Sequence, residues 1–148
     1  MTTVRRWEAP RPGVVGYVPG AWDMFHIGHL NILRRAREYC DTLVVGVTDD
    51  HALLTGKGRA PIIPEHERLE IVTALSIVDH AILDHSFDKR DAWRAVHFDV
   101  LFKGDDWRGT VKGRQLEEQM AEVGARVHYF PYTVHTSSTH LRRAIGAL

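Results

Sequence analysis

Apolar and polar positions along the chain alternate between a strand pattern and a helix pattern. A continuous run, typical of a strand buried on both faces, extends over residues 42–48, and further strands are expected from Val14 to Val18 and over residues 78–83, 99–103 and 126–130. Between these segments, apolar residues recur every three or four positions. This spacing predicts a helix from about His26 through Tyr39 and further helices over residues 65–75, 89–96, 110–123 and 137–147.

Three features of the pattern define element ends. Residues 49–64 are polar and contain Gly56, Gly58 and two prolines, so a loop is expected there. Gly124 is expected to end the helix before it, and Ser137 or Ser138 to cap the last helix. The apolar residues of that last helix are expected to face the core; they are Leu141, Ala144, Ile145 and Leu148.

Strands that alternate with helices predict an α/β fold with an open, mostly parallel five-stranded sheet and helices on both faces. In such sheets a ligand lies beyond the carboxyl ends of the strands, where the strand order reverses. With the order 3-2-1-4-5, the first and fourth strands are neighbours at that reversal. The site is therefore expected where the turn from Gly20 to His29 meets the turn from Lys103 to Asp106.

Length and composition fit one domain. A chain of 148 residues with 44% hydrophobic content supports a single core, expected over residues 14–148. Residues 1–13 contain Arg5, Arg6, Pro10 and Pro12, lack the apolar segment of a secretory signal and are expected to form a loose tail. No apolar run approaches the roughly 20 residues of a membrane span, so no membrane partner is expected.

Charge and cysteine content exclude further classes of protein. Lys and Arg together number 19, as do Asp and Glu, so no overall field attracts nucleic acid, and the patch of Arg34, Arg35 and Arg37 is interpreted as a solvated helix face. The single Cys40 excludes an internal disulfide and fits a reducing compartment. A cytoplasmic protein without a nucleic-acid partner is expected.

The most informative stretch follows the first strand. Gly20 opens a turn, Asp23 follows, and His26 and His29 are three residues apart around a helix start, where they can face the same side. Gly28 between them leaves the backbone open to close approach. A strand that leads into a helix also presents free N–H groups and the positive end of the helix dipole, which together favour an anion.

Other polar clusters fit the same chemistry. Lys57 and Arg59 lie among glycines, where basic side chains can close over phosphates. Lys103 follows an apolar strand and is expected to need a partner, with Asp105 and Asp106 as candidates. Hydroxyl groups gather before the last helix at Thr133, Thr136, Ser137, Ser138 and Thr139, more of them than capping requires.

Two alternatives stay open on the residues alone. A metal hydrolase would use His26, His29 and Asp23 as ligands, although the usual carboxylate pattern is missing. A nucleotide-binding module without turnover would use the same phosphate-binding residues. Measured metal content tests the first alternative, and pyrophosphate release tests the second.

Taken together, the motifs G-x-W-D-x-x-H-I-G-H, P-x-E-H-E-R, V-D, K-G-D-D-W and T-S-S-T resemble the H-x-G-H nucleotidyltransferase (cytidylyltransferase) family over about residues 14–145. The bacterial glycerol-3-phosphate cytidylyltransferase group looks most similar. The resemblance implies a Rossmann-like domain, often a homodimer, that transfers CMP from CTP to a small phosphorylated alcohol and releases pyrophosphate. It also implies Mg²⁺ bound through the NTP phosphates, with no protein metal ligands.

The resemblance implies a role for each matching residue. His26 and His29 would stabilise the transition state on the triphosphate, and Lys57 and Arg59 would hold phosphates; these four form the expected catalytic set. With the residues indicated by the motifs, the expected nucleotide-binding set is Gly20, Ala21, Trp22, Asp23, Gly28, Arg68, Lys103, Gly104, Asp105, Trp107, Tyr132, Thr133, Thr136, Ser137, Ser138 and Thr139.

The chain departs from the cytidylyltransferase pattern at three positions. Tyr132 stands where the family signature has Arg, His135 where it has Gly, and Ser76 where it has the Arg before V-D. The related heptose-1-phosphate adenylyltransferases also have Ser at that position and a K-G strand end like Lys103-Gly104. Transfer of AMP from ATP to a sugar phosphate is therefore the second expectation.

Overall fold

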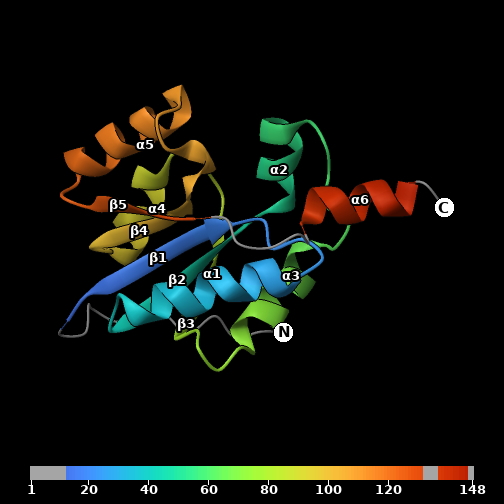
Figure 1. The fold of residues 1–148 in the computed structure, drawn as a ribbon, viewed down its shortest axis with the longest axis horizontal. Helices are drawn as coiled ribbons and strands as arrows, with labels where there is room; N and C mark the ends of the chain where they lie inside the picture. Colours follow the sequence, from blue (N-terminus) through green and yellow to red (C-terminus); the bar gives the residue numbers. More distant parts are fainter. Residues whose placement is uncertain (1–12, 132–136, 147–148) are drawn as a thin grey trace.

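The structure is a computed structural model that describes residues 13–131 and 137–146. Its elements are β1 (Val15–Gly20), α1 (Ile27–Glu38), β2 (Thr42–Thr48), α2 (Asp50–Lys57), α3 (Glu65–Thr73), β3 (His80–Asp84), α4 (Lys89–Val96), β4 (Val100–Gly104), the short 3-10 helix η1 (Asp105–Trp107), α5 (Val111–Glu122), β5 (Arg126–Phe130) and α6 (Ser138–Gly146) (Figure 1). The expected tail, apart from Gly13, lies outside the described residues.

The five strands form one parallel sheet in the order β3-β2-β1-β4-β5. Val15 of β1 pairs with Thr42 of β2, and Gly16 pairs with Val100 of β4. The expected α/β fold class and strand order are confirmed, and every strand pair is parallel. The order reverses between β1 and β4, so their carboxyl ends lie side by side.

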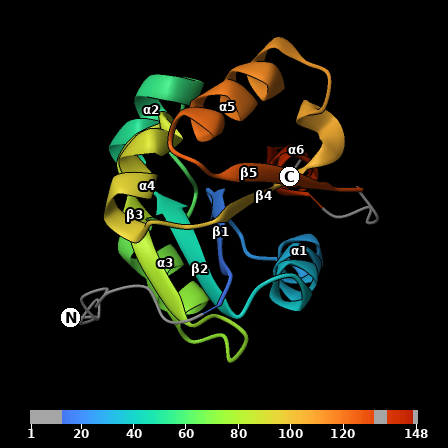
Figure 2. The same cartoon turned by 90° about the vertical axis from the view of Figure 1, so that its left-hand side faces the viewer.

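Helices cover both faces of the sheet (Figure 2). On one face, α1 and α3 bury residues such as Leu33 and Val72 against β1 and β2. On the other face, α4 and α5 bury residues such as Val96 and Met120 against Tyr17 and Leu101. Because β1 and β2 are covered on both sides, their residues are apolar on both faces, which explains the continuous runs in the sequence.

A buried polar network fixes the centre of the sheet. The Tyr17 hydroxyl donates to Asp84 Oδ2 over 2.6 Å, and Lys89 Nζ donates to the same oxygen over 2.8 Å. Burial, with the nearby Asp84 carboxylate, raises the pKa of Tyr17 well above its ordinary value, so the hydroxyl keeps its proton. Gly46 makes room for this hydroxyl, since a Cβ there would lie 1.8 Å from the Tyr17 oxygen.

The expected loop over residues 49–64 is wrong in its first half, which forms α2. The Asp49 side chain caps this helix by accepting from Ala52 N over 2.7 Å, and Gly58 ends it with φ of 75°. Ala52 and Leu53 are buried. The two prolines later in the segment favour the prediction of a loop over the whole segment, so the sequence pattern does not indicate this two-turn helix.

The last helix also differs from expectation. Ser137 Oγ accepts from His140 N over 3.0 Å, which confirms the predicted cap. The described part of α6 contains no fully buried residue, and Ile145 is 51% exposed. Ala144 is exposed too and Leu148 lies outside the described residues, so the expected inward-facing stripe is not formed. No helix in the described ranges has the length and apolar character needed to cross a bilayer.

Candidate functional site

The turn after β1 has an unusual backbone. Trp22 and Met24 have φ values of 56° and 51°, in a region that non-glycine residues adopt rarely and that often marks functional sites. The Trp22 ring holds the turn in place, because its Nε1 donates to the Gly46 carbonyl over 2.9 Å. Gly20 permits this packing, since a Cβ there would lie 2.9 Å from the indole. The turn therefore presents the following residues at the carboxyl edge of the sheet.

His26 and His29 form a reciprocal cap at the start of α1. His26 Nδ1 accepts from Gly28 N over 3.0 Å, and His29 Nδ1 accepts from His26 N over 3.3 Å. The two rings stack with their centroids 3.8 Å apart. A backbone N–H can only donate, so each Nδ1 must be an acceptor and each Nε2 carries the ring proton. The predicted shared face is confirmed, and Gly28 is occupied in the cap.

Burial keeps both imidazoles neutral. It lowers the pKa of His29 from its ordinary 6.5 to about 3, with a smaller contribution from His26. Burial also lowers the pKa of His26. Within the described residues, His26 Nε2 is buried and has no hydrogen-bond partner. The site thus holds an N–H donor whose buried position requires an acceptor from outside the chain.

The depressed pKa of His29 makes folding stability depend on pH. The unfolded chain binds a proton below about pH 6.5 while the folded chain does not, so this stability is complete above pH 6.5 and is lost as pH falls toward about 3. We expect the free energy of unfolding of the wild type to fall faster than that of His29→Asn, by up to about 1.4 kcal/mol per pH unit. Urea denaturation of both proteins from pH 7 to pH 4 measures this difference. Parallel curves would contradict the assignment.

A cavity of about 240 Å³ opens beside the two histidines. The β1–α1 turn lines it with Gly20, Ala21, Trp22, Asp23, His26 and His29. The end of α2 and the segment after it contribute Leu53, Lys57, Arg59 and Pro61. The start of α6 contributes Ser137, Ser138, Thr139 and Arg142. In Figure 1, β1 points its carboxyl end toward the space between α2 and α6.

Asp23 joins the three segments that surround the cavity. Its buried carboxylate accepts from the backbone N–H groups of Ile62 and Ile63, each over 2.9 Å, and pairs with Arg142. Its carbonyl accepts from Ser138 Oγ over 2.7 Å. Burial raises the pKa of Asp23, but these hydrogen bonds and Arg142 outweigh it and hold the pKa below its ordinary value. Asp23 therefore holds together the segments that surround the cavity.

The metal-hydrolase alternative does not fit this arrangement. The Asp23 carboxylate is occupied by three donors and cannot join His26 and His29 as a ligand. Across residues 13–131 and 137–146, no group of three or more His, Cys, Asp or Glu side chains could hold a metal ion.

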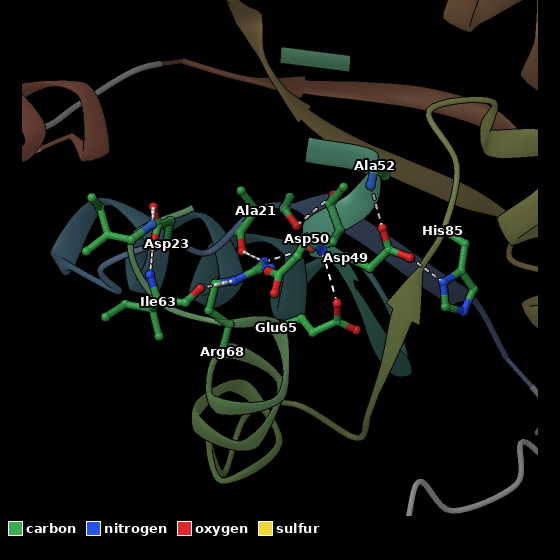
Figure 3. A network of polar contacts seen from close by, with 12 residues as sticks. Ala21, Asp23, Asp49, Asp50, Ala52, Ile63, Glu65, Arg68 and His85 are labelled. Carbon is green, nitrogen blue, oxygen red and sulfur yellow. Dashed lines mark hydrogen bonds and ion pairs between the residues drawn. The ribbon is translucent and has the colours of Figure 1, made fainter. Parts of the chain in front are cut away.

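Arg68 lies behind the cavity wall and does not line it. The residue is 1% exposed, and its guanidinium donates to the carbonyls of Ile63, Ala21 and Thr48 over 2.6–2.8 Å. It also pairs with Asp50 over 2.7 Å (Figure 3). These contacts join the β1–α1 turn to α2 and α3. In this structure the Arg68 donors are used within the chain, and a contact between Arg68 and the nucleotide stays a prediction.

Residues at the end of β4 lie beside the cavity and are not among its lining residues. They are Lys103, Gly104, Asp105 and Trp107. In the described part of the chain, no carboxylate lies within ion-pair distance of Lys103, in contrast to the expected pairing with Asp105 or Asp106. Instead, its Nζ lies 4.0 Å from the Trp107 ring centroid. Tyr132, Thr133 and Thr136 lie outside the described residues.

The structure also places residues in the cavity that the sequence interpretation missed. Leu53 belongs to the unexpected helix α2, and Pro61 follows it. Arg142 lies four residues after Ser138, a spacing that puts both on one face of a helix. That spacing after the hydroxyl cluster was the available signal for Arg142.

The composition of the cavity wall fits a polyphosphate. Lys57, Arg59 and Arg142 are cations, and Lys57 has its pKa lowered by burial and by the charges of Arg142, Arg59 and Lys112. Ser137, Ser138 and Thr139 add hydroxyls and the start of α6, and the histidines add neutral N–H donors. Among the described lining residues Asp23 is the only acid and is paired with Arg142, so the excess of cations favours a multiply charged anion.

Comparisons with known proteins agree with this geometry. The family described as cytidylyltransferase-like matches residues 17–144. The bifunctional protein HldE of Hyphomonas neptunium is 37% identical over 118 residues, which cover 78% of this chain and 24% of HldE. The ethanolamine-phosphate cytidylyltransferase of Arabidopsis thaliana is 39% identical over 95 residues, which cover 61% of this chain and 22% of that protein. The chain thus spans about a quarter of the length of these relatives.

Solved structures share the architecture. The lipopolysaccharide core biosynthesis protein of Thermoplasma volcanium GSS1 has a TM-score of 0.69 and 26% identity over 84% of this chain and 99% of that one. The pantoate-beta-alanine ligase of Francisella tularensis, at 13% identity and a TM-score of 0.65 over 94% of this chain and 71% of that one, shows the fold alone. By its match over residues 17–144, the chain belongs to the cytidylyltransferase-like family, as its motifs predict.

Proposed function

We propose that the cavity binds a nucleoside triphosphate and transfers its nucleoside monophosphate to a small phosphorylated acceptor, with release of pyrophosphate. The observation that carries this proposal is the buried Nε2–H of His26 beside His29, which has no partner among the described residues, at a cavity that also contains Lys57, Arg59 and Arg142. Neutral N–H donors and fixed cations are suited to a triphosphate. Membership of the cytidylyltransferase-like family supports the same reaction class.

The reaction needs alignment and charge neutralisation and no general base. An acceptor phosphate oxygen is already anionic, and it attacks the α-phosphorus in line while pyrophosphate leaves. His26 and His29, held by the reciprocal cap, donate to oxygens on which negative charge grows in the transition state. Lys57, Arg59 and Arg142 neutralise the departing pyrophosphate. A Mg²⁺ ion held by the nucleotide phosphates would add charge neutralisation there.

CTP with glycerol 3-phosphate is the first substrate pair that we propose. It follows from the cytidylyltransferase motifs and from the similarity to a cytidylyltransferase of Arabidopsis thaliana. ATP with a sugar phosphate is the second pair, favoured by Ser76 and by Lys103-Gly104, and by the likeness to a lipopolysaccharide core biosynthesis protein.

A panel of substrate pairs tests the proposal. Purified protein with Mg²⁺ is mixed with CTP or ATP and with glycerol 3-phosphate, a sugar 1-phosphate or a polyol phosphate, and pyrophosphate is measured. We expect release with one nucleotide, only when an acceptor is present, and none with glycerol in place of its phosphate. A nucleotide that binds without pyrophosphate release in any pair would identify a binding module and contradict the proposal.

A further inference from the structure

All four lysines of the chain converge on one region beside the cavity. They are Lys57 on α2, Lys89 on α4, Lys103 on β4 and Lys112 on α5. Lys103 interacts electrostatically with each of the other three. Lys103 and Lys112 are nine residues apart, whereas Lys57 and Lys89 come from more distant parts of the sequence and are brought near them by the fold.

Trp107 lies beside two lysines of this cluster. Lys103 Nζ lies 4.0 Å and Lys112 Nζ lies 5.9 Å from its ring centroid. The backbone beside the ring packs on the first turn of α5, where a Cβ on Gly113 would lie 1.9 Å from the Trp107 carbonyl oxygen. The Trp107 backbone is therefore held against α5, next to Lys112.

The charge of the cluster is only partly balanced. Lys89 pairs with Asp84 over 2.8 Å, whereas within the described residues Lys57, Lys103 and Lys112 have no carboxylate in ion-pair distance. Burial lowers the pKa of Lys103 to about 8; the charge of Asp106 opposes this shift, and Lys57, Lys89 and Lys112 add to it. Such a cluster repels itself and is stabilised by a bound anion.

Lys57 connects this cluster to the nucleotide cavity. Its charge interacts with Arg59 and Arg142 on the cavity side and with Lys112 on the α5 side. Lys103 and Lys112 do not line the cavity. The positive region thus continues past the cavity, with Lys57 common to both parts.

We propose that Lys103 and Lys112 bind the phosphate of the acceptor and select a dianionic phosphate monoester, with Lys57 between this phosphate and those of the nucleotide. The inference rests on the proposed function and specifies its acceptor class. An acceptor phosphate oxygen forms the new bond to the α-phosphorus, the bond from that phosphorus to the bridging oxygen breaks, and pyrophosphate leaves with the electron pair. Lysine suits this role, since a compact ammonium group offers three donors to a tetrahedral oxyanion.

Calorimetric titration with methyl phosphate tests this site without requiring turnover. We expect Lys103→Met and Lys112→Met each to weaken binding by about 10-fold or more, the effect of losing a charge-assisted contact. Arg114→Met is the matched control, because Arg114 is exposed and lies two residues from Lys112, on another face of α5. We expect it to bind like the wild type, and dimethyl phosphate, a monoanion, to bind at least about 10-fold more weakly than methyl phosphate.

A second readout separates a direct contact from a structural role. At pH 8 about half of Lys103 is unprotonated, so binding of a dianion should take up protons, and the binding enthalpy should differ between buffers of different ionisation enthalpy. Lys103→Met should reduce this uptake and Arg114→Met should keep it. Unchanged affinity in both lysine variants would overturn the proposal, as would an equal loss in His26→Asn, which would place methyl phosphate in the nucleotide cavity.

The same variants distinguish the failure of this inference from the failure of the proposed function. Lysine-dependent binding of methyl phosphate without pyrophosphate release from any substrate pair would contradict the transferase function and leave the anion site in place. Pyrophosphate release with an unchanged acceptor KM in Lys112→Met would contradict this inference alone.

Discussion

His26→Asn is expected to lower kcat by on the order of 10²–10³-fold while the protein stays folded. The asparagine Oδ1 can replace His26 Nδ1 as the acceptor for Gly28 N, and asparagine is among the best helix N-caps. It has no atom in the position of Nε2, so the buried donor of this cavity-lining residue is lost. Steady-state kinetics with the active substrate pair measure kcat, and urea denaturation measures stability.

His26→Ala provides the comparison, since alanine removes both the donor and the cap. We expect a similar loss of kcat, together with about 1 kcal/mol of lost stability that the asparagine variant does not show. A kcat in His26→Asn within about threefold of the wild type would mean that His26 is only a helix cap, because loss of a transition-state donor has a far larger effect.

Arg68→Met is expected to lower the free energy of unfolding by about 3–5 kcal/mol. The substitution leaves Asp50 without its buried partner and the carbonyls of Ala21 and Thr48 without their donor. A loss of this size is a large part of the 5–15 kcal/mol that stabilises a typical domain. Arg68→Lys should recover little of this lost stability, because one ammonium group cannot replace a planar guanidinium group that donates to four acceptors.

Arg94→Met is the control for Arg68. Arg94 also pairs with an aspartate, but the side chains of Arg94 and Asp91 are 65% and 51% exposed. Exposed pairs contribute at most about 1 kcal/mol, so this variant should unfold close to the wild type. Equal, small losses in both variants would show that Arg68 does not hold the turn and α2 together.

The fold was largely predictable because its central strands β1 and β2 are buried on both faces. Continuous β-branched runs such as residues 42–48 have few alternative structures, and short connections between strand and helix restrict the strand order. The helix α2 was missed because only Ala52 and Leu53 are buried in its two turns. A helix of that length shows too little periodicity to be separated from a polar loop.

The candidate site was predictable where local sequence determines the geometry. The spacing of His26 and His29 at a helix start places both on one side, and the cap hydrogen bonds then fix their rings. Arg68 illustrates the limit, because its position in a motif does not say whether the guanidinium faces a ligand or four acceptors within the chain. That distinction depends on contacts between segments up to 47 residues apart.

The close approach of Tyr17 to Gly46 links the evolution of two neighbouring strands. With a side chain at residue 46 the phenol has no room, since even a methyl carbon would lie 1.8 Å from its oxygen. A relative with alanine at position 46 should therefore carry a smaller residue at position 17, and the alanine substitution alone should be far more harmful than the double change. Substitutions at positions 17 and 46 are therefore epistatic, because the residues that are tolerated at one position depend on the residue at the other.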